Sequence, residues 1–118
     1  MEIRDKLIPE YFPNVMLSCA EVDGTIAGFI GLSGDKIEML FVDADFMCQG
    51  IGTFLIGEAI KEGAMLVDVN EQNPKALEFY KNKGFVEIGR SATDEAGRPF
   101  PVLHLALSRR HCLRKIIS

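Results

Sequence analysis

The sequence has few residues that hold metals or form covalent crosslinks. Its 118 residues include only two histidines and three cysteines, Cys19, Cys48 and Cys112, which are scattered and odd in number. The cysteines lack the spacing of a metal site, and such a set is typical of reduced thiols rather than of a disulfide framework. We therefore expect a cytoplasmic protein without a bound metal, in which Cys19 lies in a strand and packs in the core.

Long hydrophobic runs and an excess of positive charge are also absent. The longest apolar stretch is far too short to span a membrane, and no signal peptide is recognisable. A formal net charge of −4 argues against broad binding to nucleic acid. With 47% hydrophobic and 25% charged residues, the composition is that of a globular protein. We expect one domain over residues 1–108 and, in 109–118, a basic tail that is disordered or loosely packed.

A pair of glycines, Gly50 and Gly52, lacks the rest of the common nucleotide-binding motifs. A dinucleotide fingerprint has a third glycine three residues later, where this chain has Leu55, and no Gly-Lys-Ser/Thr run of a P-loop follows. The pair lies between a predicted strand, 38–42, and a predicted helix. Backbone N–H groups in such a turn, together with the helix dipole, favour an anion such as pyrophosphate. The alternative is a tight turn without a ligand.

The run from Asn73 to Phe85 predicts a short helix with a marked start and end. Asn73 is a favourable N-cap, Pro74 costs no hydrogen bond at the first helical position, and Gly84 can end the helix in a left-handed turn. Apolar and aromatic residues lie at helical spacing between these ends, at Ala76, Leu77, Phe79 and Tyr80. A polar group at the helix start and a phenol two turns later can both reach one cleft.

Together these two runs resemble the GCN5-related N-acetyltransferase (GNAT) family. The second signature of that family, Asn-x-x-Ala-x-x-Phe-Tyr-x-x-x-Gly-Phe, is matched at every fixed position from Asn73 to Phe85. The first signature, Gln/Arg-x-x-Gly-x-Gly/Ala, is met only in part, because Met47 replaces the Gln or Arg and Gln49 lies in another register. This departure removes one polar or cationic contact to a pyrophosphate but leaves the backbone cradle.

The resemblance implies an α/β fold, the acyl-CoA N-acyltransferase (GNAT) fold: a mixed central sheet of about six strands with flanking helices. Strands are predicted at 15–22, 25–32, 36–42, 65–70, 85–91 and 102–107, and helices at 50–63 and 74–83. Residues 1–13 predict a short helix ended by Pro13. Family members usually begin with a strand and two helices, most of which we expect to be missing. The strand at 15–22 would then be an open sheet edge, suited to pairing in a homodimer.

The family also implies how acetyl-CoA is held. Its pantetheine arm would lie between the strands at 38–42 and 65–70, and Asn73 would hydrogen-bond a pantetheine amide. Backbone groups of the first of these strands would hold the arm and the acetyl carbonyl, namely those of Leu40, Phe41 and Val42. Backbone N–H groups of the following loop and helix start would hold the pyrophosphate, with help from the last hydroxyl, namely those of Cys48, Gln49, Gly50, Ile51, Gly52 and Thr53.

Tyr80 is the implied general acid, since a phenol with a pKa of about 10 suits a departing thiol. Two carboxylates compete as general base. Asp68 interrupts an otherwise apolar strand, and Glu38 opens the strand at 38–42, where alternation places it on the face of Leu40 and Val42.

Three further polar residues are candidates for the acceptor side. Asn70 and Glu71 could line the acceptor site, although Glu71 also fits a surface charge. His104 lies on the last predicted strand, where a satisfied structural histidine is favoured over a base. The loop at 91–101 would contribute to specificity.

These features predict an acetyl-CoA-dependent N-acetyltransferase that transfers acetyl directly to a primary amine in a ternary complex. The alternative is a non-catalytic acyl-CoA-binding or regulatory protein, which Met47 and the short N-terminus favour, and an inert paralogue is a third reading. The acceptor is a small-molecule or peptide amine that the sequence does not specify. The net negative charge favours a cationic one.

Overall fold

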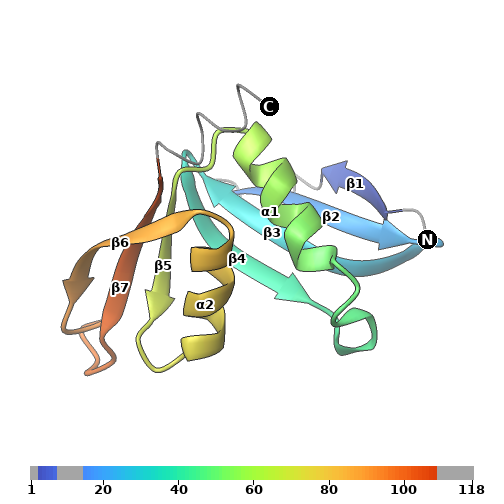
Figure 1. Ribbon diagram of the computed structural model, residues 1–118. Coiled ribbons are helices and arrows are strands. Elements are labelled where there is room, and N and C mark those ends of the chain that lie inside the picture. Colours follow the sequence, from blue (N-terminus) through green and yellow to red (C-terminus); the bar gives the residue numbers. More distant parts are fainter. Residues whose placement is uncertain (1–2, 8–14, 109–118) are drawn as a thin grey trace. The chain divides into compact units, whose positions relative to one another are not determined.

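The computed structural model describes residues 3–7 and 15–108. The chain forms two compact units, unit 1 (Met1–Met65) and unit 2 (Leu66–Ser118). The described residues contain seven strands, two α-helices and one 3-10 helix, η1 (Figure 1). The predicted basic tail lies outside the described residues.

Unit 1 contains an antiparallel sheet in which neighbouring strands are also consecutive in sequence. Its strands are β1 (Ile3–Leu7), β2 (Met16–Val22), β3 (Thr25–Ser33) and β4 (Lys36–Val42). They are followed by η1 (Ala44–Phe46) and helix α1 (Ile51–Lys61). Asp23 and Gly24 join β2 to β3 with φ angles of 50° and 81°, which is the left-handed geometry of a two-residue hairpin turn.

The first strand corrects the prediction of a helix over residues 1–13. Ile3–Leu7 is a strand that pairs with β2, from Ile3 opposite Val22 to Leu7 opposite Ser18. Pairing satisfies the backbone groups along β2, and this long-range gain overrides a local helical periodicity. β2 therefore has a partner on each side and is not the open edge that the sequence predicts. The rest of the predicted helix lies outside the described residues.

Helix α1 packs closely against β3 because Gly28 has no side chain. A Cβ atom at Gly28 would lie 2.5 Å from the carbonyl oxygen of Phe41, 3.2 Å from Ile51 Cγ2 and 3.3 Å from Leu55 Cδ1. Ile51 and Leu55 are fully buried, at 1% and 0% exposure, so the contact fixes the first turn of α1 on the sheet.

A β-bulge changes which residues of β4 share a face. Leu32 is opposite Ile37 and Gly31 is opposite Met39, so Glu38 is the extra residue of β4. Ile30, which shares a face with Leu32, is opposite Leu40. Ile37 and Leu40 therefore lie on one face, whereas strict alternation would separate them. The strict alternation on which the expected face of Glu38 depends is thus broken at Glu38 itself, and the face of Glu38 stays a prediction.

Unit 2 contains β5 (Leu66–Asn70), α2 (Pro74–Asn82), β6 (Phe85–Ser91) and β7 (Val102–Leu107). β7 pairs antiparallel with both β5 and β6. One face of these strands is apolar and buried, with Val67, Val69, Leu103, Leu105 and Leu107. Phe85 is opposite Leu107 and meets the ring of Tyr80 edge-on at 5.7 Å, so α2 covers this face. Asp68 and His104 are a cross-strand pair of the other face.

The remaining predicted elements agree with the structure to within two residues at each end. Cys19 is 2% exposed, which confirms its predicted place in the core. Neither α-helix in the described part of the chain, 11 and 9 residues long, could cross a membrane.

Two glycine substitutions test the packing of α1. Gly28→Ala should lower the free energy of unfolding by about 1–3 kcal/mol, because the new methyl overlaps the backbone of β4. Gly57→Ala is the matched control: it lies inside α1 with nothing within 4 Å of its Cβ position, and it should stabilise the protein by about 0.5–1 kcal/mol. Urea unfolding measures both. A neutral Gly28→Ala would contradict the close approach.

Candidate active site

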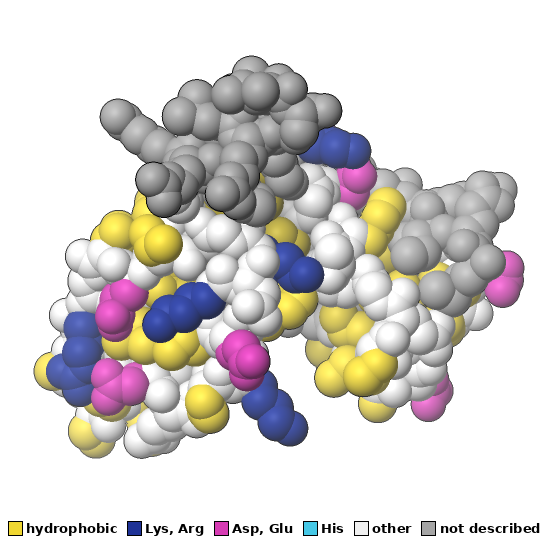
Figure 2. Space-filling model, in the orientation of Figure 1, with side chains coloured by type: hydrophobic (Ala, Val, Ile, Leu, Met, Phe, Trp, Pro, Cys, Tyr) yellow, Lys and Arg dark blue, Asp and Glu magenta, His cyan; other side chains and the backbone are white. Residues whose placement is uncertain are grey.

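The loop after β4 forms a tight, strained approach to α1. Asp43 caps η1, with its Oδ1 accepting a hydrogen bond from the Asp45 N–H at 2.9 Å. Met47 follows and is 59% exposed, and hydrophobic side chains reach the surface at this end of unit 1 (Figure 2). Cys48 and Gly50 both have positive φ angles, 62° and 82°. A non-glycine residue in that region stores strain of order 1 kcal/mol, which the surrounding turn must hold.

The N-terminus of α1 leaves the backbone N–H groups of its first turn without a side-chain cap. Its N-cap, Gly50, offers no side-chain acceptor, and the first turn contains no acidic residue. The N–H groups of that turn, including those of Ile51, Gly52 and Thr53, therefore have no side-chain cap. Thr53 is exposed beside them. Unpaired N–H groups and the positive end of the helix dipole together favour a phosphate group.

The other predicted residues of unit 1 lie on β4 or in the loop. Phe41 is 50% exposed, and its ring stacks on Phe29 with centroids 5.2 Å apart. Leu40 and Val42 are half-buried, and Glu38 is exposed at the bulge. Gln49 is exposed and donates from Nε2 to the carbonyl oxygen of Asp45 at 3.4 Å, so its side chain stays local.

Helix α2 begins as the sequence predicts, and its cap occupies one of the two polar atoms of the Asn73 side-chain amide. Asn73 Oδ1 accepts a hydrogen bond from the Ala76 N–H at 3.1 Å, and Pro74 occupies the first helical position. The amide oxygen is thus committed to the helix. What remains for a ligand is the Nδ2 donor.

Tyr80 is the only buried residue of α2, at 7% exposure. Burial raises the pKa of its hydroxyl to about 12. The hydroxyl has no hydrogen-bond partner among the described residues, and none of their fully buried side-chain oxygens lacks a partner, so this oxygen reaches the surface. Its ring is fixed between Phe79, at 5.3 Å, and Phe85. The result is a rigid phenol that stays protonated and presents one donor outward.

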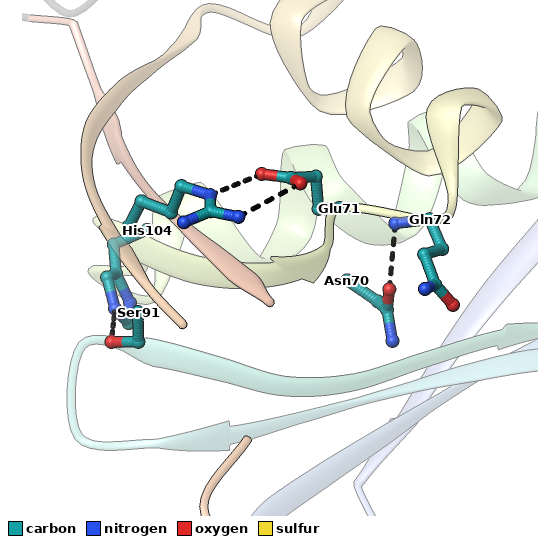
Figure 3. Close-up of polar contacts among 6 residues, drawn as sticks. Asn70, Glu71, Gln72, Ser91 and His104 are labelled. Carbon is teal, nitrogen blue, oxygen red and sulfur yellow. Dashed lines mark hydrogen bonds and ion pairs between the residues drawn. The ribbon is translucent and has the colours of Figure 1, made fainter. Parts of the chain in front are cut away.

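Asp68 belongs to a hydrogen-bonded chain that crosses the three strands of unit 2. His104 Nδ1 lies 2.7 Å from Asp68 Oδ1, and His104 Nε2 lies 2.7 Å from Ser91 Oγ. Figure 3 shows Ser91 meeting the ring of His104. Both ring nitrogens are therefore satisfied, as expected of His104. The chain lies on the face opposite α2, so Asp68 and Tyr80 lie on opposite faces of these strands.

The acceptor-side candidates are engaged locally. Arg90 of β6 forms a bidentate ion pair with Glu71, which lowers the pKa of Glu71 through the hydrogen bond. This pairing favours the surface-charge interpretation of Glu71 over a base. Asn70 Oδ1 accepts from the Gln72 N–H at 2.8 Å (Figure 3). Asp94 orders the loop before β7 by accepting from the N–H groups of Ala96 and Arg98.

Ser91 and Arg90 were missed by sequence reasoning. Both residues follow Gly89 at the end of a predicted strand, which is only a weak signal. Their partners are His104, 13 residues from Ser91, and Glu71, 19 residues from Arg90. No group of three or more metal-ligating side chains occurs among residues 3–7 and 15–108.

The buried phenol predicts a change of stability with alkaline pH. The pKa of Tyr80 is about 12 in the folded chain and about 10 when unfolded. Burial of the neutral phenol therefore contributes fully to the free energy of unfolding below pH 10, and this contribution is lost as pH rises through 12. Over that window the loss is roughly 2–3 kcal/mol. Unfolding titrations at pH 9 to 12 should show a smaller loss for Tyr80→Phe than for the native chain, and parallel curves would refute the burial effect.

The chain is similar to known proteins over most of its length. The sequence model of the family described as "Acetyltransferase (GNAT) domain" matches residues 3–102. The chain is 40% identical over 108 residues to "Peptidyl-lysine N-acetyltransferase YjaB" of Escherichia coli K12, which covers 89% of this chain and 72% of that protein.

Solved structures show the same fold. The solution structure of apo-form YjaB from Escherichia coli has a TM-score of 0.72 and 38% identity, covering 80% of this chain and 65% of that one. The chain thus spans just under two thirds of that solved protein. A GNAT family acetyltransferase from Elizabethkingia anophelis with acetyl-CoA bound has a TM-score of 0.73 at 18% identity, over 84% of this chain and 79% of that one.

These matches confirm the predicted fold class, and they do not favour a non-catalytic protein. The family match covers most of the chain, and the E. coli relative at 40% identity is a named N-acetyltransferase. The chain belongs to the GNAT family of N-acetyltransferases.

Proposed function

We propose that this chain transfers the acetyl group of acetyl-CoA directly to the ammonium-bearing side chain of a lysine in a protein or peptide. The observation that carries the proposal is Tyr80. Its ring is fixed by two aromatic neighbours, its hydroxyl reaches the surface without a described partner, and its raised pKa keeps it protonated. A positioned donor of this kind suits the protonation of a leaving thiolate.

The loop of unit 1 is proposed to bind the pyrophosphate of CoA. Support comes from the left-handed Gly50, the uncapped first turn of α1 and the absence of acidic residues there. Backbone N–H groups from Cys48 to Thr53 would supply the hydrogen bonds. Met47 offers no charge at a position where the family has Gln or Arg, so the site relies on backbone donors and the helix dipole.

The acyl end of the ligand is assigned to backbone groups and one amide. Backbone groups of Leu40, Phe41 and Val42 would hold the pantetheine arm and the acetyl carbonyl. Asn73 would donate from Nδ2 to a pantetheine carbonyl, because its oxygen is already used in the helix cap. Acetyl-CoA itself supplies an acetyl thioester.

Of the two carboxylates proposed as base, the contacts favour Asp68. Asp68 is 28% exposed and is held by His104, whereas Glu38 projects from an exposed bulge. A carboxylate that is held in place, as Asp68 is, can orient a proton acceptor beside it. An exposed carboxylate such as Glu38 has no fixed partner that it could orient.

A cationic acceptor is supported by two observations. The net charge of the chain is −4, which attracts cations over distance. The E. coli relative at 40% identity is named for peptidyl-lysine. A cytoplasmic location and a homodimer remain predictions.

Asn73 allows the binding role to be separated from the folding role. Asn73→Asp keeps a cap oxygen but loses the Nδ2 donor, so acetyl-CoA affinity should fall about tenfold with stability unchanged. Asn73→Ala should lose the same affinity and also about 1 kcal/mol of stability. Calorimetric titration with acetyl-CoA and urea unfolding measure the two effects. Equal affinity for Asn73→Asp and the native chain would remove Asn73 from the site.

Tyr80→Phe tests the acid. Acetyl-CoA affinity should stay within about twofold, while kcat for acetylation of a lysine peptide should fall about 100-fold, because only the departing thiolate needs the proton. Release of CoA thiol, followed with a thiol reagent, gives the rate. Acetyl-CoA binding by the native chain without turnover on a panel of lysine peptides and small amines would favour the non-catalytic alternative.

A further inference from the structure

The sheet of unit 1 has one face under α1 and an opposite face that carries two stacked aromatic rings. Gly28 of β3 faces Ile51 and Leu55 of α1, so the next residue, Phe29, points to the opposite face. Phe29 is opposite Phe41 on β4, and their rings stack with centroids 5.2 Å apart and an interplanar angle of 27°. Both rings therefore lie on the face of the sheet that α1 does not cover.

Exposure on this face rises from β2 toward β4. Leu17 and Cys19 of β2, which share the face because Cys19 is opposite Phe29, are 7% and 2% exposed. Phe29 of β3 is half-buried, and Phe41 of β4 is 50% exposed although its ring is stacked. A large ring that a neighbour holds in place, with half of its surface in solvent, is suited to contact with another apolar group. The face is thus accessible at the strand that we propose to hold the acetyl group.

The hydrogen bonds of β4 divide its residues into two sets. The Asp43 N–H donates to the carbonyl oxygen of Ala27 at 2.8 Å, on the side of β3. In an antiparallel pair this orientation recurs at every second residue, so the backbone of Phe41 also faces β3, whereas Leu40 and Val42 direct their backbone groups away from it. The backbone contacts proposed for acetyl-CoA are thereby narrowed to Leu40 and Val42. The part of Phe41 that remains for a substrate is its ring.

The two faces of this sheet differ in what can reach an acetyl group at β4. On one face, Ile51 and Leu55 of α1 are 1% and 0% exposed, so a peptide cannot pass between the helix and the strands. The other face is open at Phe41. An acceptor that approaches an acetyl group held by Leu40 and Val42 would therefore pass the ring of the residue between them.

We propose that the ring of Phe41, supported by Phe29, is the surface on which the methylene stem of the acceptor lysine packs, and that it selects long, unbranched primary amines. This inference rests on the proposed acetyltransferase function and names the part of the acceptor that is recognised. The stem of a lysine offers apolar area to the ring while its amine extends beyond it. No basic residue occurs between Lys36 and Lys61, so this segment does not repel the ammonium.

The first test is a series of peptides whose acceptor residue is lysine, ornithine or diaminobutyrate, each one methylene shorter than the one before. With the native chain, kcat/KM should fall about fourfold for each methylene removed, because that methylene no longer packs on the ring. With Phe41→Ala the fall should be less than about twofold for each. Each ratio is taken within one protein, so it does not depend on how much of a variant is folded. Equal ratios in the native chain and Phe41→Ala would overturn the proposal.

Two further variants separate the ring from a general loss of apolar surface. Phe41→Tyr restores a ring and should recover the native ratios. Met16→Ala removes a side chain of similar exposure, 49%, from β2, which β3 separates from β4, and should also keep them. Acetyl-CoA affinity of Phe41→Ala, measured by calorimetry, should stay within about twofold, because the backbone groups of Leu40 and Val42 remain. A parallel loss of acetyl-CoA affinity and peptide selectivity would reject the proposal in favour of a structural role.

The second test needs no turnover. In the presence of CoA, which has no acetyl group to transfer, a bound lysine peptide should show upfield shifts of its methylene protons in NMR spectra, caused by the ring current of Phe41. The shifts should vanish with Phe41→Ala and persist with Met16→Ala. A native chain that leaves these protons unshifted would contradict the contact between stem and ring.

The outcomes separate this contact from the function on which it rests. If the methylene shifts appear but no amine is acetylated, the acetyltransferase proposal fails and the binding of the stem stands. If the native chain acetylates the lysine peptide and Phe41→Ala keeps the same ratios, the role of the ring fails and the enzyme stands.

Discussion

The missing side chain at Gly28 is the constraint on which unit 1 depends. The first turn of α1 rests on β3 because no Cβ keeps Ile51 and Leu55 away from the strand. That contact fixes the start of the helix, and the start of the helix fixes where its unpaired N–H groups point. The left-handed Gly50 and the strained Cys48 are then the conformations that a short loop must adopt to reach this start from β4. The position of the uncapped helix start, which we propose to bind pyrophosphate, is therefore a consequence of how closely one helix can approach one strand.

Unit 2 is organised by the alternation of side chains along its strands. Residues that point toward α2 are apolar and buried, and those that point away include Asp68 and His104. The same alternation that builds the core thus places a phenol on one face and a polar chain on the other. Because the two faces are chemically distinct, the phenol of Tyr80 and the carboxylate of Asp68 have very different surroundings within one small unit.

Much of this fold follows from local sequence signals, and the parts that do not have identifiable causes. Helix α2 could be predicted because its cap, its proline and its terminal glycine all lie within one run of 13 residues, so the signals for its start and its end are local. β1 could not, because its backbone is satisfied by β2, many residues away. The bulge at Glu38 was equally hidden, since an extra residue in a strand leaves no mark on composition. Candidate residues within motifs lie on the elements where the sequence predicted them, and their roles stay predictions. Ser91 became visible only when three strands brought it to His104.

The bulge in β6 has a consequence for how the molecule behaves at high concentration. Glu87 is opposite Leu105 and Gly89 is opposite His104, so Ile88 is an extra residue, and it is 62% exposed. Within unit 2, β6 pairs only with β7. Val86, two residues before Ile88 on the same strand, is also 48% exposed. A straight apolar strand in such a position would be a template for intermolecular sheet growth. The kink from the bulge breaks the regular spacing of N–H and C=O groups that an incoming strand would need. We therefore expect the irregular residue to oppose aggregation at a position where its exposed apolar side chains alone would promote it.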